Sequence, residues 1–289
     1  MLFKLFGYMV KSIAAEAAPT SETIRLSLPP TAYPQVEITM KRKWILQSMA
    51  AIALGGLLPG MAAAQAANTL SAQEKAAGWQ LLFNGRNLEG WHAYLEKSPG
   101  KDWTVDHGAI RLEKTGHDQP KDFADLVSDA EYGNFDLKLE WKMSPCADSG
   151  VMFHVRESPK YGATYETGPE MQIADLACTK PDSRVLNERS GDLFDLISSD
   201  VERVREAGQW NRFEIVFDQG HLQLFQNGHK VIDTHLWTAD WNKLVAGTKF
   251  KAWPDFGIFH SGHVSLQGTE DKGPMPIRLW FRDIRIRRL

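Results

Sequence analysis

The stretch that decides the fold is Ser149–Asp175, SGVMFHVRESPKYGATYETGPEMQIAD. Its first part alternates apolar and polar residues, as a β-strand with one buried face does. The alternation directs Val151, Phe153 and Val155 toward a core, and His154 and Arg156 toward the opposite face, outward or into a concave groove. A loop rich in Gly, Tyr, Thr and Pro follows, and a second strand pattern ends the stretch. We therefore expect two strands joined by a loop.

The second of these strands carries the side chains best suited to chemistry. Glu170 and Gln172 share one face, and a bulge at Ile173–Ala174 would bring Asp175 to the same side. Two carboxylates beside an amide form an acid/base arrangement. Such residues on an outward strand face are nevertheless more often solvated than catalytic, and a lone His154 beside an Arg is more often structural. Spacing alone leaves both interpretations open.

The rest of residues 67–289 repeats the pattern of short strands and tight turns. Alternation with a period of two is clearest in NFDLKLEWKM at 134–143. The segment WNRFEIVFDQGHLQLFQNGHKV at 210–231 predicts two more strands and an Asn-Gly turn. We find no long helical pattern and no internal repeat in this region. The sequence therefore predicts an all-β protein, a two-sheet sandwich or jelly roll.

The first 66 residues differ in character from the rest. From Met40 the chain reads MKRKWILQSMAAIALGGLLPGMAAAQA, with a basic start, an apolar run and small residues before Ala66. This is the pattern of a secretory signal peptide. We expect residues 1–39 to be an upstream extension from a mis-assigned start, residues 40–66 to be the signal peptide, and residues 67–289 to be one domain. The mature protein is then periplasmic or secreted, and a membrane anchor is disfavoured because the apolar run is short.

Charge and cysteine content narrow the classes of partner. The chain has 33 basic and 36 acidic residues, of which 6 and 3 lie in the first 66 positions, so the mature part is acidic. This balance disfavours nucleic acid and anionic membranes as partners. Cys146 and Cys178 both lie in the exported part, where a disulfide persists if geometry allows it. The histidines have no metal-ligand spacing, so we expect no metal and no cofactor.

Eight segments in order resemble the bacterial 3-keto-disaccharide hydrolase family. They are LLFNGRNLEGW, WTVDHGAI, YGNFDLKLEWK, DSGVMFHV, GPEMQIAD, GQWNRFEIVF, LFQNG and LWFRDIRIRRL. The resemblance spans Gly78–Leu289 and implies a jelly roll of the concanavalin A-like lectin and glucanase type, with sugar bound on a concave face. The strand with Glu170, Gln172 and Asp175 also looks like the E-x-D-x-x-E strand of retaining laminarinase-type glucanases, but its last two positions differ.

This resemblance implies an exported hydrolase that cleaves the glycosidic bond of 3-keto-glycosides or 3-keto-disaccharides. A ketone at C3 acidifies the C2 proton, so a base can form an enolate and expel the C1 substituent, after which water adds back. A sugar 3-dehydrogenase would have to supply the oxidised substrate. Two alternatives stay open: a non-catalytic carbohydrate-binding module, and a retaining β-glucanase whose two carboxyls lie about 5 to 5.5 Å apart.

The predicted site residues follow from combining this chemistry with the two strands. Glu170 or His154 is expected to act as the base, and Asp175 as the acid or as the group that orients it. Gln172 and Arg156 are expected to donate hydrogen bonds to the ketone oxygen and to hydroxyls. The other expected substrate-binding residues are Glu140, Tyr165 and Gln267. Convergence of the strand residues in one pocket would favour catalysis.

Overall fold

The computed structural model describes residues 66–178, 187–199, 203–268 and 275–289. The expected extension 1–39 and the expected signal peptide 40–66, except Ala66, lie outside the described residues, so these boundaries stay predictions. The residues from 64 onward cluster as one unit. Across the part of the chain that the structure describes, no helix has the length and apolar character needed to cross a membrane.

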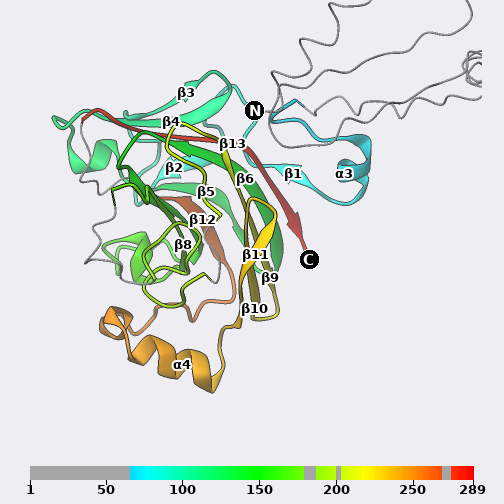
Figure 1. The fold of residues 1–289 in the computed structure, drawn as a ribbon, viewed down its shortest axis with the longest axis vertical. Helices are drawn as coiled ribbons and strands as arrows, with labels where there is room; N and C mark the ends of the chain where they lie inside the picture. Colours follow the sequence, from blue (N-terminus) through cyan, green and yellow to red (C-terminus); the bar gives the residue numbers. More distant parts are fainter. Residues whose placement is uncertain (1–65, 179–186, 200–202, 269–274) are drawn as a thin grey trace, which may run out of the picture. The chain divides into compact units, whose positions relative to one another are not determined.

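Two antiparallel sheets face each other across the core (Figure 1). In spatial order, sheet A contains β11 His229–His235, β10 His221–Gln226, β9 Asn211–Asp218, β6 Phe135–Met143, β13 Ile277–Arg288, β4 Ala109–Lys114 and β3 Trp103–Asp106, with β1 Gln80–Leu81 also paired to β13. Sheet B contains β2 Trp91–Ala93, β5 Leu126–Tyr132, β12 Gly262–Leu266, β7 Asp148–Val155 and β8 Glu170–Ala174. The predicted all-β, two-sheet jelly roll is confirmed.

Short helices precede the first strand and occupy connections between later strands. They are α3 Ala72–Ala76, η1 Pro120–Asp122, η2 Thr164–Glu166, α4 Ala239–Ala246 and η4 Lys249–Ala252. The longest of them, α4, lies at one end of the sandwich (Figure 1). It begins where the Thr238 side chain accepts a hydrogen bond from Trp241 N, a capping contact that replaces a missing helical partner. The indole of Trp241 is buried, so α4 contributes to the core.

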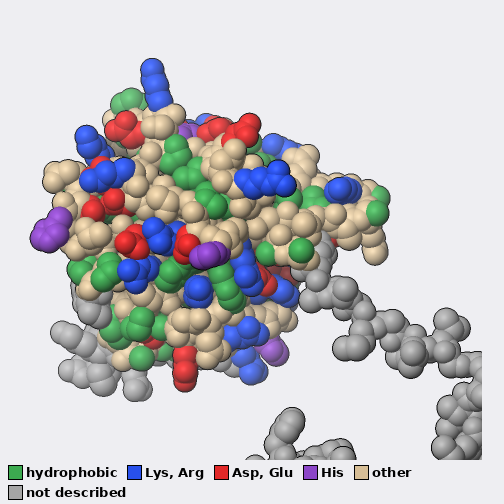
Figure 2. Space-filling model, turned by 90° about the horizontal axis from the view of Figure 1, so that it is seen from above, with side chains coloured by type: hydrophobic (Ala, Val, Ile, Leu, Met, Phe, Trp, Pro, Cys, Tyr) green, Lys and Arg blue, Asp and Glu red, His purple; other side chains and the backbone are tan. Residues whose placement is uncertain are grey.

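Strand β6 shows why the sheets pack together. Phe135, Leu137, Leu139 and Trp141 are at most 1% exposed, because alternate side chains enter the core between the sheets. Burying each of these side chains contributes about 1.5–3 kcal/mol. The intervening Lys and Glu residues face outward, so the alternation predicted for residues 134–143 is confirmed. On the face seen in Figure 2, acidic and basic side chains are interspersed rather than gathered by sign.

A bulge in β7 changes which residues face the core. Between Met152 and Val155, β7 holds one residue more than the facing segment of β12. His154 adopts a φ of 54°, and both Phe153 and His154 are buried. A bulge of this kind interrupts the strict alternation of a strand. The expectation that His154 faces outward is therefore wrong, since it is only 1% exposed and its ring packs against Phe217 of the core. The expectation that Val155 faces the core is wrong for the same reason, because Val155 lies with Met152 in a separate buried cluster.

Candidate active site

Strand β8 places Glu170, a predicted base, and Gln172, a predicted donor, on the outer face of sheet B, the face turned away from the sandwich core. Met171 and Ile173 alternate with them and are fully buried in that core. Glu170 and Gln172 therefore share a face, as predicted, and are 5% and 2% exposed. Within the described pairing of β7 with β8, the register runs without a shift, so the bulge expected at Ile173–Ala174 does not occur there.

Gly150 provides the space in which the Glu170 carboxyl lies. This glycine sits on β7 directly opposite Gln172, two residue pairs along the ladder from the Met152–Glu170 pair. A β-carbon added at Gly150 would stand 1.8 Å from Glu170 Oε1 and 2.5 Å from its Cδ. The carboxyl group therefore lies across the neighbouring strand, on the surface that only a glycine leaves open. The sequence alone did not indicate this role for Gly150. The role depends on the pairing of β7 with β8, which places Gly150 opposite Gln172.

Two amide side-chain residues flank this carboxyl. Gln172 Nε2 donates a 2.9 Å hydrogen bond to Asp148 Oδ1 on β7. On the other side of Gly150, Gln267 N donates to the Gly150 carbonyl oxygen at 2.9 Å, and the Gln267 carbonyl accepts from Ser149 Oγ at 2.8 Å. Gln267 therefore follows β12 beside Gly150. Of the predicted residues, Glu170, Gln172 and Gln267 come together, and Asp148 is a neighbour that the sequence did not suggest.

The middle of the same face is apolar. A small buried cluster there contains Tyr94, Val127, Met152 and Val155. Predicted residue Tyr165 packs against this cluster, and its ring meets Trp253 edge to face with centroids 5.4 Å apart. Met152 pairs with Glu170 across β7 and β8, so the cluster begins beside the backbone of Glu170. Tyr165 therefore shares this face of sheet B with Glu170.

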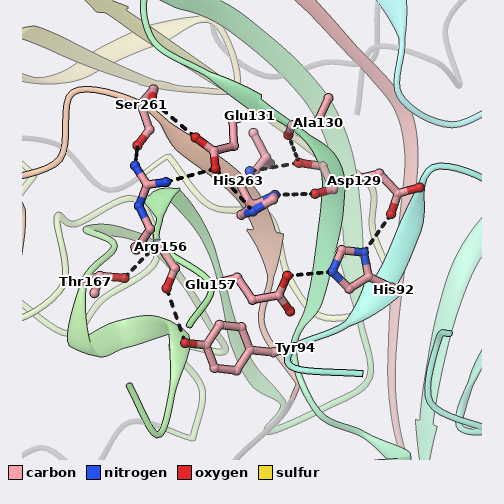
Figure 3. Close-up of polar contacts among 12 residues, drawn as sticks. His92, Tyr94, Asp129, Ala130, Glu131, Arg156, Glu157, Thr167, Ser261 and His263 are labelled. Atoms are coloured by element: carbon pink, nitrogen blue, oxygen red, sulfur yellow. Dashed lines mark hydrogen bonds and ion pairs between the residues drawn. The ribbon is translucent and has the colours of Figure 1, made fainter. Parts of the chain in front are cut away.

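At the far end of this face lies a second polar group, the His92 network, made of His92, Asp129, Glu131, Arg156, Glu157 and His263 (Figure 3). The imidazole of His92 binds Asp129 through Nδ1 at 2.6 Å and Glu157 through Nε2 at 3.0 Å. Burial opposes protonation of His92, but the hydrogen bonds and charges of these two carboxylates outweigh it and raise the pKa. Because both ring nitrogens form hydrogen bonds, His92 links Asp129 on β5 to Glu157 in the loop after β7.

Arg156 belongs to this network rather than to the surroundings of Glu170. Its Nη1 donates to Glu131 Oε1 at 3.0 Å, and its Nη2 donates to the Ser261 carbonyl oxygen at 3.3 Å. The Tyr94 hydroxyl lies 3.3 Å from the backbone oxygen of Arg156 (Figure 3) and 3.3 Å from that of Tyr161, and its one hydrogen is shared between these two acceptors. Burial raises the pKa of Tyr94 to about 12, so this hydroxyl stays protonated. The contacts hold the loop of residues 156–168 to the sheet.

His154 lies inside the sandwich, on the other side of sheet B from Glu170. Its ring packs edge to face against Phe135, Phe153 and Phe217, with centroids 4.6 to 5.8 Å apart. Its Nε2 hydrogen-bonds to the Gly133 carbonyl oxygen at 2.8 Å. Burial lowers the pKa of His154, which favours the neutral ring. The structure separates His154 from Glu170 by the thickness of the sheet.

Asp175 follows the end of β8 and lies beside a disulfide. Its Oδ2 accepts a 2.8 Å hydrogen bond from Cys146 N, and its Oδ1 accepts from Ala177 N at 3.1 Å. Cys146 and Cys178 are bonded to each other, which answers the question that the sequence left open. Their sulfurs and the Asp175 carboxyl are close enough to hold an ion, but the disulfide removes the thiolates that a metal would need. Asp175 organises this loop.

Glu140 lies on the outer face of sheet A, across the molecule from Glu170. It accepts hydrogen bonds from Arg212 Nη2 and Arg282 Nε, both at 2.9 Å. Burial opposes ionisation of Glu140, but the two guanidinium groups outweigh it and lower the pKa. This carboxylate lines a groove of about 840 Å³, which is separate from the Glu170 surroundings. Glu140 therefore cannot act together with Glu170 on one small substrate.

The arrangement around Glu170 supports acid/base chemistry. One carboxyl lies in the space that Gly150 leaves open, and the amides of Gln172 on the same strand and of Gln267 after β12 supply hydrogen-bond donors. Convergence of Glu170 and Gln172 with His154, Arg156 and Asp175, which would have favoured catalysis, is not observed. His154, Arg156 and Asp175 are engaged elsewhere. What remains is a smaller site with Glu170 at its centre.

Known proteins are similar to this chain along most of its length. The chain is 29% identical over 232 residues to the 3-keto-disaccharide hydrolase of Bacteroides thetaiotaomicron, and the match covers 73% of this chain and 79% of that protein. The crystal structure of a candidate glycosyl hydrolase from Parabacteroides distasonis superposes with a TM-score of 0.68 and 28% identity, covering 78% of this chain and 100% of that one.

A second structure and a family match complete the comparison. Another candidate glycosyl hydrolase from Parabacteroides distasonis has a TM-score of 0.55 and 24% identity, and covers 73% of this chain and 99% of its own, which supports the fold. Residues 78–287 match the family described as the 3-keto-alpha-glucoside-1,2-lyase-like domain. The chain therefore belongs to the 3-keto-alpha-glucoside-1,2-lyase-like family and is a glycoside hydrolase-like enzyme.

Proposed function

We propose that this enzyme cleaves the glycosidic bond of 3-keto-glycosides, including 3-keto-disaccharides, with Glu170 as the base that removes the C2 proton. The observation that carries the proposal is the Glu170 carboxyl lying over Gly150 on the outer face of sheet B. The activity named for the Bacteroides thetaiotaomicron relative supports the choice of an oxidised sugar.

The proposed reaction has two stages. Glu170 takes the C2 proton, the electrons of the C2–H bond form the enolate of the C3 ketone, and collapse of the enolate forms a C1–C2 double bond while the C1–O bond breaks. The departing oxygen takes a proton from water or from the protonated Glu170. Water then adds to C1 and a proton returns to C2, so the net change is hydrolysis. A ketone at C3 is essential because it stabilises the carbanion.

The amides beside Glu170 fit the charge that develops during this reaction. Gln172 uses one N–H for Asp148, and an amide nitrogen carries two, so a second donor is available for an enolate oxygen. Gln267 adds a half-buried amide on the other side of Gly150. Preorganised donors of this kind stabilise an oxyanion more than its neutral precursor. In this proposal Gln172 and Gln267 therefore bind the ketone edge of the sugar.

The proposal includes where the enzyme works and what supplies its substrate. The signal-peptide pattern at 40–66 favours export, to the periplasm or outside the cell. The C3 ketone must come from oxidation of a secondary hydroxyl, which is the reaction of a sugar 3-dehydrogenase. An ordinary retaining β-glucanase is disfavoured because Asp175, the expected second carboxylate, bonds to backbone N–H groups beside the disulfide.

The deciding experiment is turnover of a 3-keto-glucoside in deuterated water. Loss of the C2 proton followed by return of a deuteron labels C2 of the released 3-keto-glucose, whereas direct displacement at C1 leaves C2 unlabelled. Glu170→Gln should lower kcat by about 10² to 10⁴-fold. Glu113→Gln is the matched control, since Glu113 pairs with Arg278 on sheet A, far from Glu170.

Three outcomes would contradict the proposal. Unlabelled product would exclude C2 deprotonation, and wild-type turnover by Glu170→Gln would remove Glu170 from the chemistry. Saturable sugar binding with no product from oxidised or unoxidised glycosides would instead favour a carbohydrate-binding module.

A further inference from the structure

The groove on the outer face of sheet A is built by elements that the proposed reaction does not use. Its volume, about 840 Å³, lies within the range of roughly 300–1,000 Å³ that is usual for ligand pockets. It is also on the opposite face of the sandwich from Glu170, since sheets A and B turn their outer faces in opposite directions. A ligand in the groove would not touch the candidate active site.

The floor of the groove consists of paired charges on adjacent strands. In one row, Glu140 on β6 lies between Arg212 on β9 and Arg282 on β13, at 2.9 Å from each. In the next row, Lys138 on β6 contacts Glu214 on β9 at 3.2 Å. Each partner uses part of its hydrogen-bonding capacity on the other and retains further N–H donors or oxygen lone pairs. The floor therefore offers donors and acceptors side by side.

One wall of the groove is the segment that precedes β1, including α3. Asn68 and Asp283 exchange hydrogen bonds, from Asn68 N to Oδ1 at 3.1 Å and from Asp283 N to Asn68 Oδ1 at 2.8 Å. Glu74, at the start of α3, pairs with Arg285. Between Arg282 and Arg285, β13 has one residue more than the facing part of β6, and Asp283 in this bulge has a φ of 55°. The bulge lies beside this segment. Trp79 ends the wall and lines the groove.

The opposite wall is formed by β10 and the turn that follows it. Phe225 on β10 pairs with Glu214 of the floor, and Gly228 lies in that turn. Both Trp79 and Phe225 are half-buried, and the Trp79 ring packs against Lys138 of the floor and against Arg287. An aromatic side chain therefore borders the polar floor on each side. Rings on the walls with hydrogen-bonding groups beneath them match a sugar, which has apolar C–H faces and a rim of hydroxyls.

We propose that this groove is a second carbohydrate-binding site, which holds a neutral oligosaccharide of about two or three residues. Neutrality follows from the lining, where four acidic and four basic side chains offset one another. An anionic sugar would meet as many carboxylates as cations. A site of this kind would keep the enzyme on a larger glycan while Glu170 acts on another sugar. It stands independently of the proposed reaction, because it requires no chemistry at Glu170.

The test is isothermal titration calorimetry of the purified protein with neutral trisaccharides: laminaritriose, cellotriose, maltotriose and isomaltotriose. Trigalacturonate is the anionic comparator. At least one neutral sugar should bind with one site per chain, and Trp79→Ala and Phe225→Ala should each weaken its Kd about tenfold. Glu113→Gln, on the same outer face but outside the groove, should bind as the wild type does. Circular dichroism and melting temperature verify that each variant is folded.

Several results would overturn this inference. No binding of any neutral trisaccharide, or tighter binding of trigalacturonate, would contradict the ligand class. Binding that survives in both folded wall variants would place the sugar outside the groove. Glu170→Gln separates the two sites: loss of trisaccharide binding in this variant alone would assign the sugar to the face of sheet B, whereas retained binding together with loss in Trp79→Ala supports the groove.

Discussion

Replacing Gly150 by alanine tests whether the place of the Glu170 carboxyl matters for catalysis. The new β-carbon would lie 1.8 Å from Glu170 Oε1 and 2.5 Å from both Cγ and Cδ. Real contacts of this type are longer than 3 Å, so the carboxyl must move by more than an ångström. The φ of Gly150 lies outside the left-handed range, so an alanine at this position would not strain the backbone. The side-chain clash alone therefore drives the effect.

The expected magnitude follows from this displacement. Misplacing a catalytic group by 1 Å lowers the rate by about 10²-fold, so kcat of Gly150→Ala on a 3-keto-glucoside should fall by at least that factor. Stability should fall by about 1–3 kcal/mol if the carboxyl is forced out of its place. Adding Glu170→Asp shortens the acid and should restore the melting temperature without restoring kcat.

The measurement is steady-state kinetics alongside thermal unfolding of each variant. Gly247→Ala is the matched control: this exposed glycine ends α4 with a φ of −85°, and a β-carbon added there would meet only backbone oxygens of α4. Wild-type kcat in folded Gly150→Ala would refute the argument, because the carboxyl could not then need its observed position.

Three further predictions concern the network, the disulfide and the buried histidine. The pKa of His92 is raised in the folded protein, so its ion pairs stabilise the fold fully below the unfolded-state pKa, near 6.5. This stabilisation is lost as the pH rises through the folded-state pKa. The melting temperatures at pH 6 and pH 8.5 should therefore differ more for the wild type than for His92→Asn. Reducing the Cys146–Cys178 bridge, which spans 32 positions, should lower the free energy of unfolding by about 2–4 kcal/mol in urea titrations, and an unchanged midpoint would count against it. His154→Ala should leave a cavity among aromatic rings and cost about 2–4 kcal/mol, measured in the same titrations against His229→Ala, an exposed control.

Patterns that depend on neighbouring residues were predictable from the sequence. The alternation in β6 gave its buried face, and the turn signals around β9, β10 and β11 gave the hairpins. Glu170 and Gln172 share a face because their spacing alone decides it. These features are local, so they can be predicted from the residues of one strand without knowing its partner strands.

Features that depend on distant partners were not predictable. The β7 bulge, which turns His154 inward, appears in the pairing with β12, more than a hundred residues later. Arg156 is held by Glu131 of β5 and by Ser261, neither of which its own strand pattern reveals. The role of Gly150 required knowing which residue lies across from it. In each case tertiary pairing, rather than local propensity, determined where the side chain went.

The disulfide gives the candidate site a dependence on its chemical surroundings. Cys146 precedes β7 and Cys178 follows β8, so the bridge closes the whole hairpin that carries Gly150 and Glu170 into a covalent ring. In a reducing compartment this ring would be open, and the hairpin edge of sheet B would be held by hydrogen bonds and packing alone. Protein made in a reducing cytosol is therefore expected to have a looser candidate-site hairpin than oxidised protein of the same sequence.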